Sequence, residues 1–236
     1  MNHADVGFTV ALIGPDGAGK TTVARLLEDA LERPAVYLYM GDNPDASNRS
    51  LPTTRLAAAL KRRTGRSVDH GPPDWKPGQS ARSRRRWTNG LRSAKSLLRM
   101  GNQLAEEYYR LLVAWRHLRA GRIVLFDRHF FTDYYAWDVV GGRGERTLAR
   151  RIHGAVLSRT YPKPDLVLYL DAPAEVLFAR KGEGTLESLR QRRDDYLSLR
   201  HHLRNFTVLD AGQELAQVVE AARDAIEAHA ATTAEA

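Results

Sequence analysis

The sequence predicts an α/β fold in which a parallel sheet of about five strands lies between layers of helices. Short apolar runs alternate along the chain with longer segments of helical spacing, which is typical of strands buried on both faces. The first run ends in a glycine-rich turn, and three later runs each end in an aspartate. Ligands of such sheets bind beyond the carboxyl ends of the strands, so we expect the turn and the aspartates to lie there together.

The elements are expected in the following order. Apolar residues at helical spacing predict a first helix directly after the glycine-rich turn, and a long helix that ends before Gly121. The expected strands are Phe8–Ile13, Ala35–Met40, Ile123–Phe126, Leu166–Leu170 and Thr207–Leu209. The expected helices include Lys20–Glu32 and Thr88–Ala120, and the last stretch, Ala228 to Ala236, is expected to fray.

Length and composition favour one domain over residues 1–236. A chain of 236 residues with 43% hydrophobic content can bury one substantial core. It has no cysteine, which excludes a disulfide framework and cysteine-ligated metals and permits a reducing compartment. No apolar stretch approaches the roughly 20 residues that cross a bilayer, and the first residues lack the pattern of a secretory signal. We therefore expect a soluble, cytoplasmic protein.

The positive charge is concentrated in a predicted insertion at about residues 41–100. The formal net charge is +8, yet the segment from Lys61 to Arg99 holds twelve basic residues against Asp69 and Asp74. Two interpretations are open. The segment could be a mobile, solvated cover beside the site, or it could bind nucleic acid or another polyanion with Trp75 and Trp87 as stacking residues. The cover is favoured because no nucleic-acid motif accompanies the charge.

The glycine-rich turn, Gly14 to Thr22, has the pattern G-x-x-x-x-G-K-[ST] between a predicted strand and a predicted helix, which is typical of a phosphate-binding loop, or P-loop. Glycines leave room for backbone N–H groups to wrap a polyphosphate, and the helix dipole adds to the attraction. Lys20 is expected on the β- and γ-phosphates of ATP, and Thr21 on Mg²⁺. The residues predicted to bind ATP here are Gly14, Asp16, Gly17, Ala18, Gly19, Lys20, Thr21 and Thr22. The alternative is a turn that only links strand to helix.

Asp127 and Arg128 follow the apolar run Ile123–Phe126. A carboxylate at the end of a buried strand is typical of a second Mg²⁺ ligand, which can also orient the acceptor. Arg128 could hold an acceptor phosphate through two hydrogen bonds. The alternative is an ordinary surface ion pair, which contributes under about 1 kcal/mol.

The chain resembles the thymidylate kinase-like branch of nucleoside monophosphate kinases. The phosphate loop, Asp127-Arg128-His129 and the strand region Tyr161–Pro173 resemble that family's motifs, and Leu209–Gln213 resembles its adenine-contacting turn. Residues from Arg180 to Tyr196 resemble its lid, which we place at about 180–193. The resemblance implies that Asp16 approaches the acceptor sugar. It also makes the helix containing Trp115 a candidate homodimer interface, although packing in a buried core explains the apolar face of that helix equally well. The resemblance also implies that Arg180 acts in transfer as the lid arginine, with Arg190 and Arg193 as the alternatives, and that Arg190, Arg193, Ala211 and Gly212 contact the nucleotide.

Two segments depart from the family pattern. Tyr39–Pro44 lacks the family's motif after the second strand, and Phe130–Asp138 lacks the glutamine that meets the base. Because a site that loses its base-reading hydrogen bonds loses selectivity, these departures leave the identity of the acceptor open.

Together these residues predict an in-line transfer of the ATP γ-phosphoryl group, in which the protein positions the reactants and neutralises charge on the transferring group. Lys20, Asp127, Arg128 and Arg180 are the expected catalytic residues. Gly182 and Gly184 could be a lid hinge or a plain helix break. Three functions stay open: a nucleoside monophosphate kinase acting on dTMP or a related nucleotide, a kinase for another small acceptor (nucleoside, sugar phosphate or lipid-linked), and a nucleotide-dependent switch that binds partners through the basic insertion.

Overall fold

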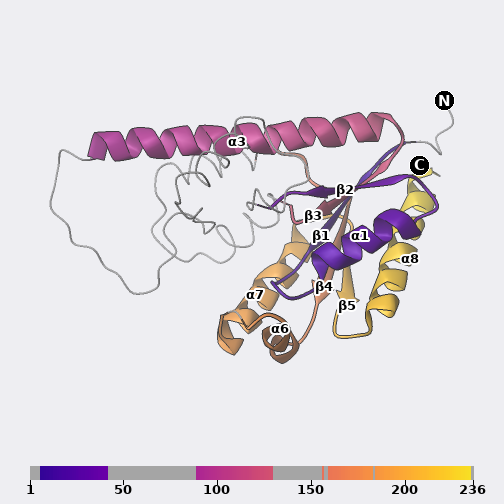
Figure 1. The fold of residues 1–236 in the computed structure, drawn as a ribbon. Coiled ribbons are helices and arrows are strands. Elements are labelled where there is room, and N and C mark those ends of the chain that lie inside the picture. The colour runs from indigo at the N-terminus through magenta and orange to yellow at the C-terminus, as the bar shows by residue number, and fades with distance from the viewer. Residues whose placement is uncertain (1–5, 42–88, 130–155, 157–158, 183, 235–236) are drawn as a thin grey trace, which may run out of the picture.

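The computed structural model describes residues 6–41, 89–129, 156, 159–182 and 184–234. Its centre is a five-stranded parallel sheet in the order β2-β3-β1-β4-β5, which confirms the predicted fold class (Figure 1). The strands are β1 (Thr9–Ile13), β2 (Ala35–Tyr39), β3 (Ile123–Asp127), β4 (Leu166–Asp171) and β5 (Phe206–Asp210). The helices are α1 (Lys20–Ala30), α3 (Asn89–Arg119), α6 (Ala174–Lys181), α7 (Leu186–Ser198) and α8 (Leu215–Ala234), and a short 3₁₀ turn, η3, spans Leu199–His201.

Helices cover both faces of the sheet because successive strand residues point to opposite sides. Val10 and Leu12 of β1 pack in one core with residues of α1 and α8, such as Leu27 and Ile226. Ala11 and its same-face neighbours on other strands pack in a second core with residues of α3, α7 and η3. All of these strand residues are apolar, which is why the strands read as continuous apolar runs rather than alternating ones.

The strand order places the carboxyl ends of β1, β2 and β3 side by side. Asp127, the last residue of β3, pairs in register with Leu12 of β1 on one side and with Tyr39 of β2 on the other. The N–H of Arg128 donates to the carbonyl of Leu12 at 3.1 Å, which holds the chain after β3 against the end of β1. The phosphate loop and the Asp127-Arg128 pair are therefore neighbours, although more than a hundred residues separate Thr21 from Asp127.

The expected element boundaries agree with the structure to within about two residues, except at the C-terminus, where the prediction of a frayed tail is wrong. Helix α8 continues to Ala234. Alanine is the best helix former, and the hydroxyls of Thr232 and Thr233 donate to the carbonyls four residues earlier at 3.0 and 2.8 Å. The ring of His229 also packs edge-on against Phe8, with 5.1 Å between centroids, which fixes this end of the helix to the body.

Part of the predicted insertion and lid can be compared with the structure. Residues 42–88 of the insertion lie outside the described residues, and residues 89–100 form the first part of α3. In the predicted lid region, α6 ends at Lys181, and Gly182 follows in the left-handed conformation as its C-cap. Helix α7 begins after Thr185, whose hydroxyl forms a capping box with Ser188. The segment predicted to be a lid therefore comprises the end of α6 and the first part of α7. None of the helices described here is long and apolar enough to cross a membrane.

Candidate functional site

The phosphate loop passes from β1 to α1 through glycines that no other residue replaces easily. Gly14 has φ +145°, and a Cβ there would lie 2.6 Å from the carbonyl oxygen of Leu170. Gly19 has φ +87° at the N-cap of α1, where no side chain caps the helix. The loop backbone thus approaches β4 closely and leaves the N-terminal amides of α1 available to an anion, as a phosphate cradle requires.

Lys20 lies at the centre of this loop. Its Nζ donates to the carbonyl oxygens of Gly14 and Pro15, both at 2.8 Å, and the side chain is 7% exposed. A buried ammonium group needs such acceptors because burial without them is costly. The contacts hold the charge of Lys20 against the loop, where phosphates bound to the loop amides would meet it.

Asp127 is fully buried beside the loop. Its Oδ2 accepts hydrogen bonds from the Thr21 hydroxyl at 2.6 Å and from the Tyr37 hydroxyl at 2.9 Å. Its Oδ1 is also buried and has no hydrogen-bond partner among the described residues. A buried carboxylate oxygen left without a donor fits a cation ligand better than a structural role.

These donors suit Mg²⁺, which binds through one or two protein oxygens and keeps its other positions for water and substrate phosphates. Thr21 and Asp127 supply a hydroxyl and a carboxylate at the carboxyl end of the sheet. No group of three or more His, Asp or Glu side chains that could hold a metal alone occurs among the described residues. A hydroxyl and a carboxylate placed together in this way fit a metal that a bound nucleotide would also hold.

Tyr37 is a site residue that the sequence did not reveal. It lies in the middle of β2, where a tyrosine in an apolar strand is ordinary core composition. Burial, followed by the negative charge of Asp127, raises the pKa of Tyr37, so its hydroxyl stays protonated and donates to Asp127. Only the pairing of β2 with β3 brings the two together.

Arg128 adopts a left-handed backbone conformation, φ 70°, directly after β3. Such a conformation costs a non-glycine residue about 1 kcal/mol or more and is concentrated at functional sites. The guanidinium donates to Asp16 Oδ1 at 2.5 Å. The structure thus joins the predicted acceptor-phosphate residue to the acidic residue of the phosphate loop.

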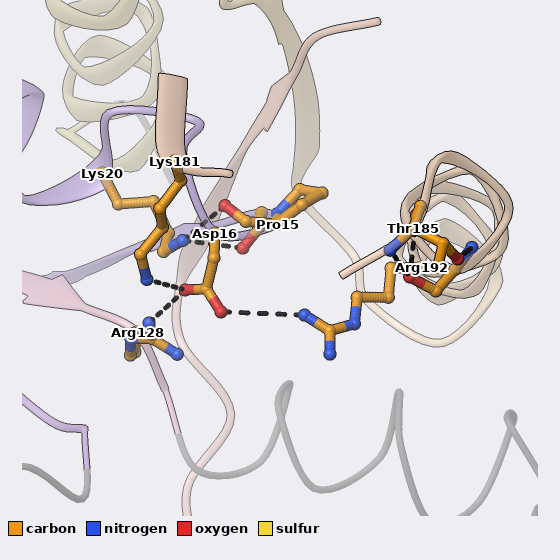
Figure 2. Close-up of polar contacts among 9 residues, drawn as sticks. Pro15, Asp16, Lys20, Arg128, Lys181, Thr185 and Arg192 are labelled. Atoms are coloured by element: carbon orange, nitrogen blue, oxygen red, sulfur yellow. Dashed lines mark hydrogen bonds and ion pairs between the residues drawn. The ribbon is translucent and has the colours of Figure 1, made fainter. Parts of the chain in front are cut away.

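Asp16 lies among several positive charges, as Figure 2 shows. Besides Arg128, Lys181 Nζ lies 3.8 Å from its Oδ1 and an Arg192 nitrogen lies 3.7 Å from its Oδ2. Burial alone would raise the pKa of Asp16, but Arg128, Lys20 and Lys181 outweigh it and lower the pKa to about 2. Asp16 is therefore ionised at neutral pH and pairs with cations from distant parts of the chain.

The lid arginines singled out from the sequence have other contacts. Arg193 binds Asp171 at the end of β4 through two hydrogen bonds of 2.7 and 2.8 Å, and Arg190 binds the exposed Glu175 at 2.5 Å. The hydrogen bond with Asp171 raises the pKa of Arg193. Helical spacing explains the difference: Arg193 lies on the same face of α7 as the buried Leu189, whereas Arg192 is turned toward the loop. The spacing shows which arginines share a face of α7, but not which face lies against the loop.

Arg180 and the turn after β5 form a separate group. Arg180 donates to the carbonyl of Ala211 at 2.9 Å, next to Gly212, whose N–H donates to the Asp210 carboxylate at 2.9 Å. The N–H of Ala211 in turn donates to the carbonyl of Asp171. Arg180, the residue expected to act in transfer, thus lies with Ala211 and Gly212, the two residues expected to contact adenine.

Two further residues predicted to bind ATP belong to the phosphate loop. Ala18 is buried, and Thr22 is exposed on α1.

A second buried polar group lies on α3 beside Arg128. Arg110, 3% exposed, donates to the carbonyl of Gly41 at 2.9 Å and pairs with Glu106 at 3.2 Å. A Cβ on Gly41 would lie 3.0 Å from the Cδ of Arg128, so the chain leaving β2 runs against that arginine. Neither Arg110 nor Glu106 lies in a recognisable sequence motif, and the helical pattern of α3 does not show which of its polar residues face inward.

The fold has a clear counterpart among solved structures. The thymidylate kinase from Candida albicans matches with a TM-score of 0.58 at 19% sequence identity, over 97% of this chain and 94% of that one. This confirms the expected thymidylate kinase-like fold. No protein-family model and no curated protein sequence matches the chain.

Proposed function

We propose that the chain is an ATP-dependent phosphotransferase of the nucleoside monophosphate kinase type, which transfers the γ-phosphoryl of ATP to dTMP or a related nucleotide. The observation that carries the proposal is the gathering of Arg128, Lys181 and Arg192 around Asp16, next to the phosphate loop. A loop that only binds a nucleotide needs no such group of cations, whereas a kinase must hold phosphates of donor and acceptor close together. The similar fold of a thymidylate kinase supports the same reaction class.

Each residue has a distinct part in the proposed reaction. The loop amides and Lys20 bind the β- and γ-phosphates of ATP, and Arg128 holds the acceptor phosphate through its planar guanidinium. The acceptor oxygen then bonds to the γ-phosphorus as the bond to the ADP oxygen breaks, in line. Mg²⁺ held by Thr21 and Asp127 would neutralise charge on the transferring group.

Tyr37 and Arg180 support this reaction from either side. The Tyr37 hydroxyl donates to Oδ2 of Asp127 and so fixes the carboxylate, which leaves Oδ1 as the oxygen that would hold the metal. Arg180, through Ala211, holds the turn proposed to contact adenine, so we move its proposed role from transfer to nucleotide binding. Lys181 and Arg192, which lie 3.8 and 3.7 Å from Asp16 in the phosphate loop, replace it as the proposed lid cations.

A screen of acceptors tests the proposal. ATP consumption is measured in the presence of Mg²⁺ with each nucleoside monophosphate, and separately with nucleosides and sugar phosphates. We expect turnover that depends on a nucleoside monophosphate and is lost in a Lys20→Met control. Turnover only with a nucleoside or sugar phosphate would favour the second function, and acceptor-independent hydrolysis would favour the nucleotide-dependent switch.

The exposed face of α3 supports the proposed homodimer. Tyr108, Leu112 and Trp115 are 37%, 46% and 50% exposed and lie three and four residues apart, in one apolar stripe. We expect light scattering to give twice the 26.5 kDa monomer mass, and the Leu112→Asp variant to be monomeric. Leu26→Asp, at an equally exposed leucine of α1, is the matched control. A monomeric parent protein would exclude this interface.

A further inference from the structure

Three cations from separate elements meet at one carboxylate of the phosphate loop. Arg128 follows β3, Lys181 ends α6, and Arg192 lies in α7, and each has a side-chain nitrogen 2.5 to 3.8 Å from an oxygen of Asp16. In Figure 2 the three side chains point at Asp16 from different directions, while Lys20 is turned to the loop carbonyls behind it.

These contacts differ from ordinary surface ion pairs. The Asp16 side chain is 27% exposed and that of Arg128 33%, so solvent screens them less than it screens the exposed Arg190–Glu175 pair, at 60% and 57%. Three cations held this close repel one another unless an anion lies between them. Asp16 is the anion that the loop itself supplies.

We infer that Asp16 is a positioning residue that stands in for a substrate phosphate: it holds Arg128, Lys181 and Arg192 together at the phosphate loop, and substrate phosphates compete with it for these cations. The inference rests on the proposed function only in assuming that phosphates bind at this loop. It differs from a contact between Asp16 and the acceptor sugar, because here the partners of Asp16 are the cations themselves.

If Asp16 competes with phosphates, replacing it raises the affinity of the protein for polyphosphate, whereas a purely structural role predicts a lower affinity. Arg128 must give up a charge-assisted hydrogen bond to Asp16 before it can grip a phosphate through the same nitrogen. Removing the charge of Asp16 therefore raises the affinity for a simple polyphosphate. If Asp16 only supported the shape of the loop, its replacement would weaken polyphosphate binding, and if it bound the acceptor sugar, polyphosphate binding would not change.

The test is calorimetric titration of inorganic tripolyphosphate into the full chain. Asp16→Asn keeps the shape of the side chain and removes its charge, and we expect it to bind tripolyphosphate about tenfold more tightly than the parent protein. Glu175→Gln is the matched control, since it also removes a carboxylate that pairs with an arginine of α7. We expect its affinity to equal that of the parent.

Amide hydrogen exchange over residues 184–192 gives the second measurement. Without Asp16 the link from Arg192 to the loop is lost, so we expect faster exchange at the start of α7 in Asp16→Asn, slowed again by tripolyphosphate. Unchanged or weaker binding in Asp16→Asn, an equal gain in Glu175→Gln, or unchanged exchange would each overturn the inference. Tripolyphosphate binding does not require transfer to an acceptor. A failure of the proposed kinase activity would therefore appear in the acceptor screen alone, whereas a failure of this inference would appear in the binding and exchange measurements.

Discussion

Replacing Lys20 by methionine is expected to lower the turnover number by on the order of 10²–10³-fold, the usual cost of removing one preorganised donor to developing charge. Methionine keeps the apolar stem of the lysine, so the effect reports the ammonium group. In the structure that group is buried and bound to the carbonyls of Gly14 and Pro15. It is therefore held against the loop that is proposed to bind the phosphates. Steady-state kinetics with the acceptor identified by the screen measure the effect.

Two further measurements make the Lys20 result interpretable. The carbonyls of Gly14 and Pro15 lose a donor in Lys20→Met, so thermal unfolding of the variant shows whether the loop still folds. Arg223→Ala removes a positive charge from exposed ion pairs on α8, far along the chain from the loop, and is expected to retain full turnover. A folded Lys20→Met protein with the turnover of the parent would contradict the proposed role of Lys20.

Replacing Asp127 by asparagine is expected to reduce turnover on the order of 10²-fold or more and to remove most of the Mg²⁺ dependence of nucleotide binding. The reason is that Oδ1 is buried without a donor while Oδ2 is already committed to Thr21 and Tyr37. An amide in this position has no charge to offer a metal. Calorimetry with a non-hydrolysable ATP analogue, with Mg²⁺ and with EDTA, measures the metal dependence separately from turnover.

Tyr37→Phe is the matched variant for Asp127→Asn. It removes one hydrogen bond to the same carboxylate and leaves the negative charge in place, which corresponds to a net cost of about 1 kcal/mol. We therefore expect a loss of turnover of about tenfold or less, with Mg²⁺ dependence retained. If Asp127→Asn and Tyr37→Phe behaved alike, Asp127 would act through its hydrogen bonds rather than as a metal ligand.

The phosphate loop could be predicted from the sequence because its chemistry is local. Its glycines, Lys20 and Thr21 are contiguous, and the left-handed backbone at Gly19 is a property of that residue and its neighbours. Asp127 could be predicted for a related reason, because a short apolar run followed by a carboxylate can be recognised from a few consecutive residues. The five strands were equally readable, since strands buried on both faces leave continuous apolar runs.

The contacts of the lid and of β2 could not be predicted in the same way. Arg190, Arg192 and Arg193 lie close together in the sequence and are chemically alike. They nevertheless contact different carboxylates, those of Glu175, Asp16 and Asp171 respectively. Which one faces the loop depends on how α7 is rotated against the sheet, and that rotation is set by the packing of Leu189 and Tyr196. In the same way, Tyr37 reaches Asp127 only because β2 pairs with β3.

The sequence by itself determined the sheet of parallel strands, the phosphate loop and the carboxylate beside it, because short-range sterics and apolar patterning specify them. Only the tertiary structure decided which cations surround Asp16, which oxygen of Asp127 is left for a metal, and that α8 continues to Ala234. These depend on packing between segments far apart in the chain, and small rotations of a helix or the choice of a neighbouring strand change them without altering the local pattern.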